Sequence, residues 1–308
     1  MADEPKKISP SAMAVLRNCP KEYEYQYVKH LPAKDFREKR PGQWLLANEK
    51  GSLIHEVMQK FYEKYIDKDL PSNADEGRFK DIFSEVLDEF KKNVPSESSE
   101  VQNREADDIY DKCKKFIDHD LQIMKTYRPW KLEWDLPDDA NEITVKSNTG
   151  ASISIRPVGR IDRIDSFLES DGKTRHLRIV DYKSGTHPEN AQKDYLQHTM
   201  YSMALDGYKD ADETYVVDWF VYEYLCADEM QSKSFAGDDI RELFPPQKNT
   251  GKAKQSEEEI VFRALSAGDY RRRDKYDVDD GVTPLSFDIK KNCRFCSYKD
   301  ICVAEYEG

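Results

Sequence analysis

The fold of this chain is decided by two runs, Gly159-Arg160-Ile161-Asp162 and Ile179-Val180-Asp181-Tyr182-Lys183-Ser184-Gly185. Both lie in β-branched or alternating segments, 158–167 and 177–183, which predict two strands. Asp171-Gly172 between them favours a tight turn, so we expect an antiparallel hairpin. Because side chains alternate along a strand, Asp181 and Lys183 share a face, and the hairpin can bring Asp162 onto it.

Two carboxylates and a lysine on one face of a sheet indicate a particular chemistry. Carboxylate oxygens converging at a sheet edge form a hard site suited to Mg²⁺ or Mn²⁺. A metal there polarises a scissile phosphate, and a neighbouring lysine can hold the attacking water and help to deprotonate it. We therefore predict phosphodiester cleavage by Asp162, Asp181 and Lys183. Taken alone, however, Asp181 and Lys183 are more typical of a surface ion pair.

Two predicted helices carry further polar candidates. His55 lies in segment 51–66, whose apolar residues recur at helical spacing. Gln197 and Tyr201 are four apart in a predicted helix over 190–205, so they project from one face and can orient the lysine or touch a nucleic-acid backbone. Each also has a plain structural interpretation. A lone histidine is more often half-buried on a helix, and an amide and a phenol suit the edge of an amphipathic helix.

A second pattern joins the two ends of the chain. Cys293, Cys296 and Cys302 stand within ten residues, and Cys19 lies more than 270 residues earlier. Four thiolates suit an iron–sulfur cube or a tetrahedral zinc, and this spacing with a remote fourth cysteine fits the cube better. Zinc and purely structural cysteines are the alternatives. A metal centre would require the two ends to meet, in a reducing compartment.

Taken in order, these motifs resemble the RecB-like branch of the PD-(D/E)XK nuclease superfamily. The matching pieces are Gly51-x-x-x-His55, Gly159-Arg-Ile-Asp162, Asp181-Tyr-Lys183, Gln197-x-x-x-Tyr201 and the opening Ser9-Pro10-Ser11-Ala12-x-x-x-x-Arg17-x-Cys19-Pro20. The split cysteine set is similar to that of the iron–sulfur nucleases, namely the AddB nuclease domain and the CRISPR-associated RecB-like exonucleases. The resemblance spans Ser9 to Cys302.

The resemblance implies a role for each matching residue and a fold for the whole. The divalent metal, Mg²⁺ or Mn²⁺, would be held by His55, Asp162, Asp181 and the main-chain carbonyl of Tyr182. The catalytic lysine and its auxiliary pair would be Lys183, Gln197 and Tyr201. A 4Fe-4S cluster would be ligated by Cys19, Cys293, Cys296 and Cys302. The implied fold is α/β, a restriction-endonuclease-like mixed β-sheet core flanked by helices.

We expect a single RecB-like nuclease domain over residues 1–308. Residues 67–128 would form a helical insert, and residues 9–30 and 288–308 would form the N/C-terminal iron–sulfur clasp.

The insert is predicted from amphipathic helical patterns over 79–91 and 105–127. The polar stretches 93–102 and 245–259 predict loops.

The overall charge narrows the choice of partners. The chain has 308 residues and a formal net charge of −12, which argues against coating nucleic acid through bulk charge. A nuclease is still compatible, because a local basic groove can lie on an acidic body. Candidate basic patches are Arg271-Arg272-Arg273 with Lys275, and Lys290-Lys291 with Arg294. No apolar run approaches the ~18–20 residues of a membrane span, and the opening lacks a secretory pattern, so we expect a cytoplasmic protein with no membrane partner.

The predicted function is that of a metal-dependent DNA nuclease. We expect an exonuclease on single strands or DNA ends, in DNA repair, recombination, phage or CRISPR-linked processing. The alternative is a non-catalytic DNA-binding or scaffold subunit of a larger nuclease–helicase complex, against which the intact Asp162, Asp181 and Lys183 argue. The sequence has no Walker-type Gly-x-x-x-x-Gly-Lys run, so unwinding would come from a helicase partner or the substrate would already be single-stranded.

Overall fold

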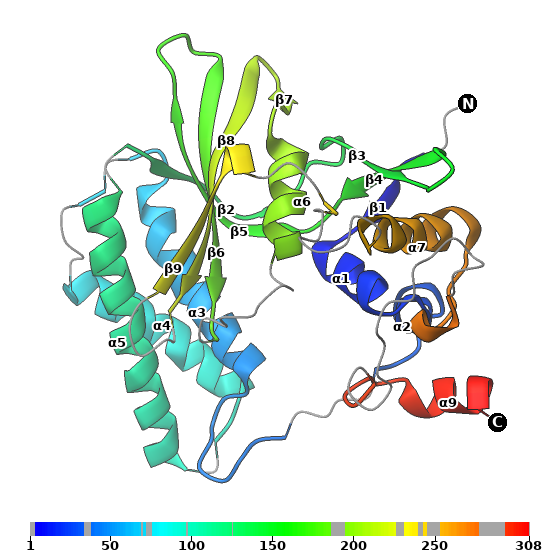
Figure 1. Cartoon of the computed structure of the whole chain (residues 1–308). Coiled ribbons are helices and arrows are strands. Elements are labelled where there is room, and N and C mark those ends of the chain that lie inside the picture. Colours follow the sequence, from blue (N-terminus) through cyan, green and yellow to red (C-terminus); the bar gives the residue numbers. More distant parts are fainter. Residues whose placement is uncertain are drawn as a thin grey trace.

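The computed structural model of the chain describes residues 4–33, 38–68, 70–71, 76–96, 98–124, 126–185, 195–225, 231–239, 243–244, 253–276 and 293–307. These residues form a larger sheet with helices against it and a smaller sheet with its own helices (Figure 1). Within these ranges, no helix combines the length and the apolar character that a membrane crossing requires.

The larger sheet has six strands in the order β2-β5-β6-β8-β7, with β9 paired to β8. They are β2 (Arg128–Asp135), β5 (Arg160–Leu168), β6 (Thr174–Lys183), β7 (Lys209–Asp210), β8 (Glu213–Tyr224) and β9 (Gln231–Ala236). All neighbours are antiparallel except β6 and β8, which run parallel. The connection between these two strands carries helix α6 (Tyr195–Leu205), as a parallel crossover requires. The sheet is therefore mixed, as predicted.

Strands β5 and β6 form the predicted antiparallel hairpin. At its turn, the carboxylate of Asp171 accepts hydrogen bonds from the main-chain N–H groups of Lys173 and Thr174. Gly172 has a φ of +66°, a conformation that glycine adopts without strain. Strand β5 begins at Arg160 rather than at residue 158, because Gly159 first turns the chain with a φ of +150°.

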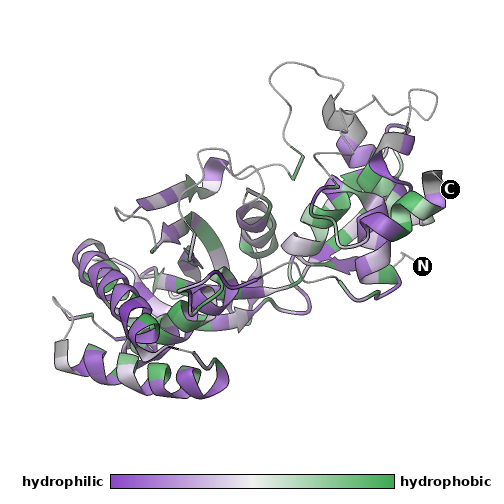
Figure 2. Ribbon diagram, turned by 90° about the horizontal axis from the view of Figure 1, so that it is seen from below, coloured by the Kyte–Doolittle hydropathy of each residue, from purple (hydrophilic) through white to green (hydrophobic). Residues whose placement is uncertain are grey.

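Three helices cover one face of the larger sheet. They are α3 (Ala47–Tyr62), α4 (Glu76–Asn93) and α5 (Ser99–Ile123), and a 3-10 turn (Glu63–Tyr65) follows the first. Their buried apolar side chains pack together and against Val180 and Tyr182 of β6. The outer sides of these helices are largely hydrophilic (Figure 2), as expected for helices with one buried face. Both α4 and α5 lie in the range predicted for the helical insert.

The smaller sheet has the order β1-β4-β3. Its strands are β1 (Lys6–Ile8), β3 (Ile143–Lys146) and β4 (Ser152–Pro157), and its helices are α1 (Pro10–Asn18) and α7 (Ala253–Ala267). Helix α6 also packs here, so it touches both sheets. Beyond this body lie α2 (Pro20–Tyr23), a π-helical turn (Glu24–Val28), a 3-10 turn (Arg273–Lys275) and α9 (Lys299–Glu307). Another 3-10 turn (Gly237–Asp239) follows β9 and packs against β8 of the larger sheet.

The two terminal regions meet, as the cysteine pattern predicted. Tyr25 packs against Tyr298 and Cys302 in a small buried cluster. The hydroxyl of Tyr298 donates to the carbonyl of Leu31 over 3.0 Å. Figure 1 shows α9 next to the segment that contains α2, at the far end of the smaller body from β1.

Two predicted loops are wrong in part. Helix α5 begins at Ser99, inside the predicted loop 93–102, because the Ser98 side chain caps it by accepting from Val101 N–H. Helix α7 begins at Ala253, inside the predicted loop 245–259. Its polar side chains suggested solvent, but Glu257 pairs with Arg17 at 2.7 Å. Residues 245–252 lie outside the described residues, and strands β1, β7 and β9 were not predicted.

Candidate active site

The hairpin register brings the two predicted aspartates together. Arg163 pairs with Val180, so one step further along the antiparallel strands Asp162 lies opposite Asp181. The Asp162 carboxylate accepts a hydrogen bond of 2.7 Å from the main-chain N–H of Tyr182. Two carboxylates thus converge at one end of the hairpin, as the sequence predicted.

Lys183 is held by Asp181 and by helix α6. Its Nζ lies 2.6 Å from Asp181 Oδ2 and donates to Gln197 Oε1 over 3.0 Å. The amide nitrogen of Gln197 donates in turn to Asp181 Oδ1. These contacts bring three predicted residues into one closed arrangement, and they fix the position of the ammonium group at the end of β6.

His55 of α3 reaches the same end of the hairpin. Its Nε2 lies 3.1 Å from the carbonyl oxygen of Tyr182, the atom predicted to bind metal. With that nitrogen directed at the main chain, Nδ1 faces carboxylates: it is 3.5 Å from Asp162 Oδ1 and 3.8 Å from Glu133 Oε1. A second-nitrogen contact of this kind is how metal-binding histidines are usually oriented.

Glu133 belongs to the site but was not predicted. On β2, Leu132 pairs with Arg163 and Trp134 with Ile161, which places Glu133 opposite Asp162. Glu133 also has a φ of +43°, which is unusual for a residue with a side chain. Its position depends on the β2–β5 register, which shifts between Pro129 and Lys131. No local motif reveals such a register, so the sequence offered only an acidic residue in a strand.

The charges at this site are crowded and partly buried. Burial, followed by the negative charge of Asp181, raises the pKa of Asp162 to about 7. Burial alone would lower the pKa of His55, but Glu133 and Asp162 raise it to about 9. A divalent cation would relieve this repulsion between carboxylates.

The donor atoms also fit a cation by type and spacing. One ligand atom each from His55, Glu133 and Asp162 lie within 4.8 Å of one another. This is the only such group among the described residues, and it omits Asp181, whose oxygens contact Lys183 and Gln197. The carboxylate oxygens of this group suit Mg²⁺ or Mn²⁺.

Tyr201 lies near the site but not against Lys183. Its hydroxyl donates to the carbonyl of Arg160 over 3.4 Å at the start of β5. A Cβ on Gly159 would be 2.3 Å from that hydroxyl, so the close approach requires glycine. The predicted auxiliary pair therefore divides: Gln197 contacts the lysine, and Tyr201 packs on the main chain two residues before Asp162.

The four predicted cysteines line one small cavity, together with buried Lys21 and Arg272. None of the described cysteines forms a disulfide. Burial raises the pKa of the Cys19 and Cys302 thiols, and that of Cys296 to about 12. No three of the sulfurs that the structure describes lie within 4.8 Å of one another. The sulfurs therefore share a cavity without being in close contact.

The first predicted basic patch is engaged inside the protein. Arg271 pairs with Asp269 at 2.9 Å, and Arg273 pairs with Glu257 at 3.2 Å. Arg272 is buried at the cysteine cavity. Lys290 and Lys291 of the second patch lie outside the described residues. Of the described residues in these patches, Lys275 and Arg294 are exposed.

Comparison with known proteins identifies the family. A family model described as the PD-(D/E)XK nuclease superfamily matches residues 7–303. A search of curated proteins finds no significant match. The mixed sheet flanked by helices is consistent with the restriction-endonuclease-like fold, and the site carries the acidic and lysine side chains that divalent-metal nucleases use. Since the matched region covers almost the whole sequence, the chain belongs to the PD-(D/E)XK nuclease superfamily, whose members are metal-dependent nucleases.

Proposed function

We propose that this protein is a RecB-like, divalent-metal-dependent deoxyribonuclease that acts on single strands or DNA ends in the cytoplasm. The observation that carries the proposal is the meeting of His55 and Asp162 beside the Lys183–Asp181 pair. Six cysteines in a chain of this length, three of them within ten residues, favour a metal and a reducing compartment over a disulfide framework. The pathway would be DNA repair, recombination, phage or CRISPR-linked processing.

Each side chain has a separate task in this proposal. His55, Asp162, Asp181 and Glu133 hold the metal, and the Tyr182 carbonyl orients His55 or binds as well. When bound, Mg²⁺ or Mn²⁺ polarises the scissile phosphate and stabilises its developing charge. Asp181 and Gln197 keep the Lys183 ammonium in place, where it would donate hydrogen bonds to the attacking water and to a phosphate oxygen and offset the negative charge that develops there.

The test is digestion of end-labelled single- and double-stranded DNA, with RNA as a third substrate. We expect cleavage of DNA with Mg²⁺ or Mn²⁺ and none after chelation. Lys183→Ala should reduce the rate of cleavage by at least about 100-fold. The substitution removes the group that holds the attacking water and offsets the negative charge developing on the phosphate. Lys173→Ala, at the exposed turn of the same hairpin, is the matched control. The proposal that this protein is a nuclease would be rejected if the wild-type protein were inactive. It would also be rejected if the wild-type protein and Lys183→Ala cleaved DNA equally fast.

The second candidate is a DNA-binding or scaffold subunit that acts with a helicase. Its support is the acidic body and the absence of a Walker-type run in the sequence. Against it are the metal-binding side chains and the lysine, which a non-catalytic copy would be free to lose. Wild-type protein that binds single-stranded DNA, but does not cleave it with either metal, would favour this candidate.

The proposal includes a 4Fe-4S cluster on Cys19, Cys293, Cys296 and Cys302. The support is chemical: four thiols line one cavity, and Arg272, which hydrogen-bonds to Cys302, can offset the charge of thiolates. The spacing of the three C-terminal cysteines in the sequence, with a remote fourth cysteine, favours the cluster over a tetrahedral zinc.

Metal analysis distinguishes the two centres. Anaerobically purified protein should be brown and contain iron and acid-labile sulfide in equal amounts. If the protein is colourless, active and contains only zinc, the four cysteines bind a tetrahedral zinc and the cluster proposal is wrong. The nuclease proposal would be unaffected by this result.

A further inference from the structure

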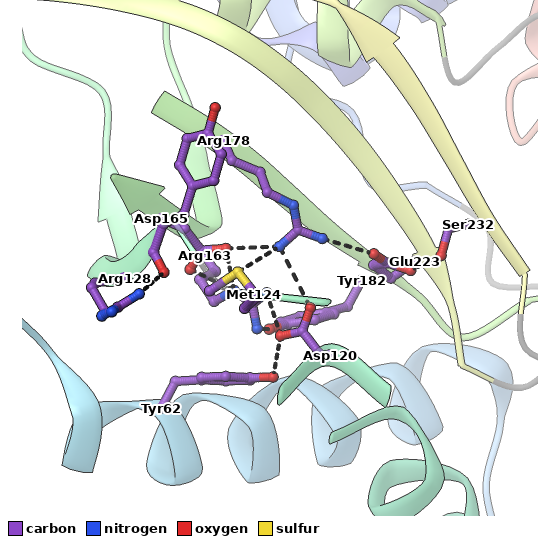
Figure 3. A network of polar contacts seen from close by, with 11 residues as sticks. Tyr62, Asp120, Met124, Arg128, Arg163, Asp165, Arg178, Tyr182, Glu223 and Ser232 are labelled. Carbon is purple, nitrogen blue, oxygen red and sulfur yellow. Dashed lines mark hydrogen bonds and ion pairs between the residues drawn. The ribbon is translucent and has the colours of Figure 1, made fainter. Parts of the chain in front are cut away.

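A buried network of charged side chains lies beneath the candidate metal site, on the face of the sheet that α5 covers (Figure 3). The side chains of Asp120, Arg163 and Asp165 are each 0% exposed. Burying charges is costly even when they are paired, and an apolar cluster of the same volume is often at least as stable. Stability alone is therefore a weak explanation for charges at this place.

Arg163 is the centre of this network. Its Nη1 donates to the hydroxyl of Tyr182 over 2.9 Å, and its Nη2 donates to Asp120 Oδ2 over 2.8 Å. Its Nε lies 3.0 Å from Asp165 Oδ1. The hydroxyl of Tyr62 donates to Asp120 Oδ2 over 2.6 Å, and the Arg163 guanidinium lies over the Tyr62 ring at 4.0 Å. Each of the three nitrogens of this guanidinium thus has a polar partner.

The network also extends across β6 to β8 and β9. Arg178 Nη1 donates to Asp165 over 2.9 Å, and its Nη2 donates to Glu223 over 3.2 Å. Glu223 pairs with Tyr182 in the sheet, and Ser232 on β9 donates to Glu223. Ser232 lies one strand further out than Glu223, so its hydroxyl can be removed without removing a contact of Tyr182 or Arg163.

Tyr182 connects this network to the metal site. Its side chain accepts from Arg163, while its main-chain N–H binds Asp162 and its carbonyl binds His55. It also stands between Asp181 and Lys183 on β6. A shift of Tyr182 would therefore move the main-chain groups that contact Asp162 and His55. It would also displace the part of β6 that carries Asp181.

The same contacts tie three separate elements to one helix. Arg163 directly follows Asp162 on β5, Tyr182 is on β6, and Tyr62 lies two turns after His55 on α3. Arg163 and Tyr62 each hydrogen-bond to Asp120, and Tyr182 reaches Asp120 through Arg163. Asp120 belongs to α5, which lies in the predicted helical insert. Rigid polar networks of this kind fix the geometry of the groups they hold.

We propose that Arg163, braced by Asp120, is a positioning residue that fixes the Tyr182 main chain and so sets the geometry of the metal site from the helical insert. The effect on cleavage rests on the proposed function, whereas the effect on metal affinity can be measured without it. Groups in the second layer around a metal typically change its affinity by about 10–100-fold when they are mutated.

The test uses the full chain and three variants. Tyr182→Phe removes only the hydroxyl that accepts from Arg163, and Arg163→Lys keeps the charge but loses the forked contact. Ser232→Ala removes a hydroxyl of the same network on β9 and is the matched control. The measurements are Mn²⁺ affinity by titration, melting temperature, and kcat and KM on single-stranded DNA.

We expect Tyr182→Phe and Arg163→Lys to weaken Mn²⁺ binding by about 10-fold and to lower kcat with little change in KM. Ser232→Ala should lower the melting temperature without changing Mn²⁺ affinity. A folded Tyr182→Phe variant with wild-type Mn²⁺ affinity and kcat would overturn the positioning role, even if Arg163→Lys fails to fold. If the wild-type protein still cleaves DNA, the proposed nuclease function stands even when the positioning role fails. If the wild-type protein binds no Mn²⁺, the positioning role and the proposed function are both wrong.

Discussion

At the scale of single residues, Gly159 lies where Tyr201 of α6 approaches the start of β5. It has a φ of +150°, and a Cβ there would lie 2.3 Å from the Tyr201 hydroxyl. We expect Gly159→Ala to lower the free energy of unfolding by about 2–4 kcal/mol, through backbone strain and displacement of Tyr201. Urea unfolding followed by circular dichroism measures this change.

Gly172→Ala is the control for backbone strain alone. Gly172 also has a positive φ, but no atom lies within 4 Å of its would-be Cβ. Its alanine variant should lose only about 1–2 kcal/mol. Equal losses for the two variants would show that the contact with Tyr201 has no energetic weight.

His176 predicts a pH-dependent contribution to stability. Its Nδ1 lies 2.9 Å from Asp218 and its Nε2 lies 2.7 Å from Glu169, and the ring stacks on Phe167. Burial would lower the pKa of His176, but these two carboxylates raise it overall. The positive charge therefore favours the folded state below the unfolded pKa of about 6.5, and this contribution is lost as the pH rises through the raised pKa.

We expect His176→Gln to cost about 0.5–1 kcal/mol at pH 6, since the ion pairs are partly exposed, and less as the pH rises. Unfolding by urea at several pH values between 6 and 9 gives the difference between wild type and variant. A difference that is constant or grows with pH would contradict the assignment of charge to this ring.

At the scale of elements, β2 determines whether the metal site has a third carboxylate. The register between β2 and β5 places Glu133 beside His55 and Asp162. Glu133→Gln keeps the shape but removes the charge, so we expect Mn²⁺ binding to weaken by on the order of 10-fold. The stabilisation of the protein by saturating Mn²⁺, measured as a shift in melting temperature, should shrink accordingly.

Glu56→Gln is the matched control. Glu56 of α3 lines one surface cleft together with His55 and Glu133, but it is not part of the ligand group. An unchanged Mn²⁺ response in Glu133→Gln, or the same loss in Glu56→Gln, would mean that Glu133 acts only through general charge.

The elements also show what the sequence could predict and why. The β5–β6 hairpin was predictable because its turn chemistry is local, at Asp171 and Gly172, and with it came the meeting of Asp162 and Asp181. Glu133 was not, because a strand pairing between residues far apart, with a shift after Pro129, leaves no local trace. The first turn of helix α7 was missed because it lies in the polar stretch 245–259, where Glu257 nevertheless pairs with Arg17.

At the scale of the whole molecule, the cysteine spacing predicted that the two ends meet, and α2 and α9 do so around one cavity. Ligation across this span would close a loop worth at most about 5 kcal/mol in chain entropy. We expect Cys302→Ser to lower the melting temperature and to expose both terminal regions to proteolysis. Differential scanning fluorimetry and limited proteolysis measure the two effects.

Cys113→Ala is the control, because Cys113 lies in the core between α3 and α5, away from the cavity. It should lower the melting temperature through lost packing, but leave the iron content and the protease resistance of the termini unchanged. An identical melting curve for Cys302→Ser and wild type would argue against a centre that clasps the ends.

The meeting of Cys19 with the cysteines before and on α9 has a consequence for how the protein is made. A ribosome adds about 5–20 residues per second, so Cys19 emerges roughly 15–60 s before Cys302. During translation the opening helices are therefore exposed, with Cys19 as a thiol, until α9 is made and can pack against them. Oxidants or competing metals that reach the nascent chain in this interval would act on Cys19 first.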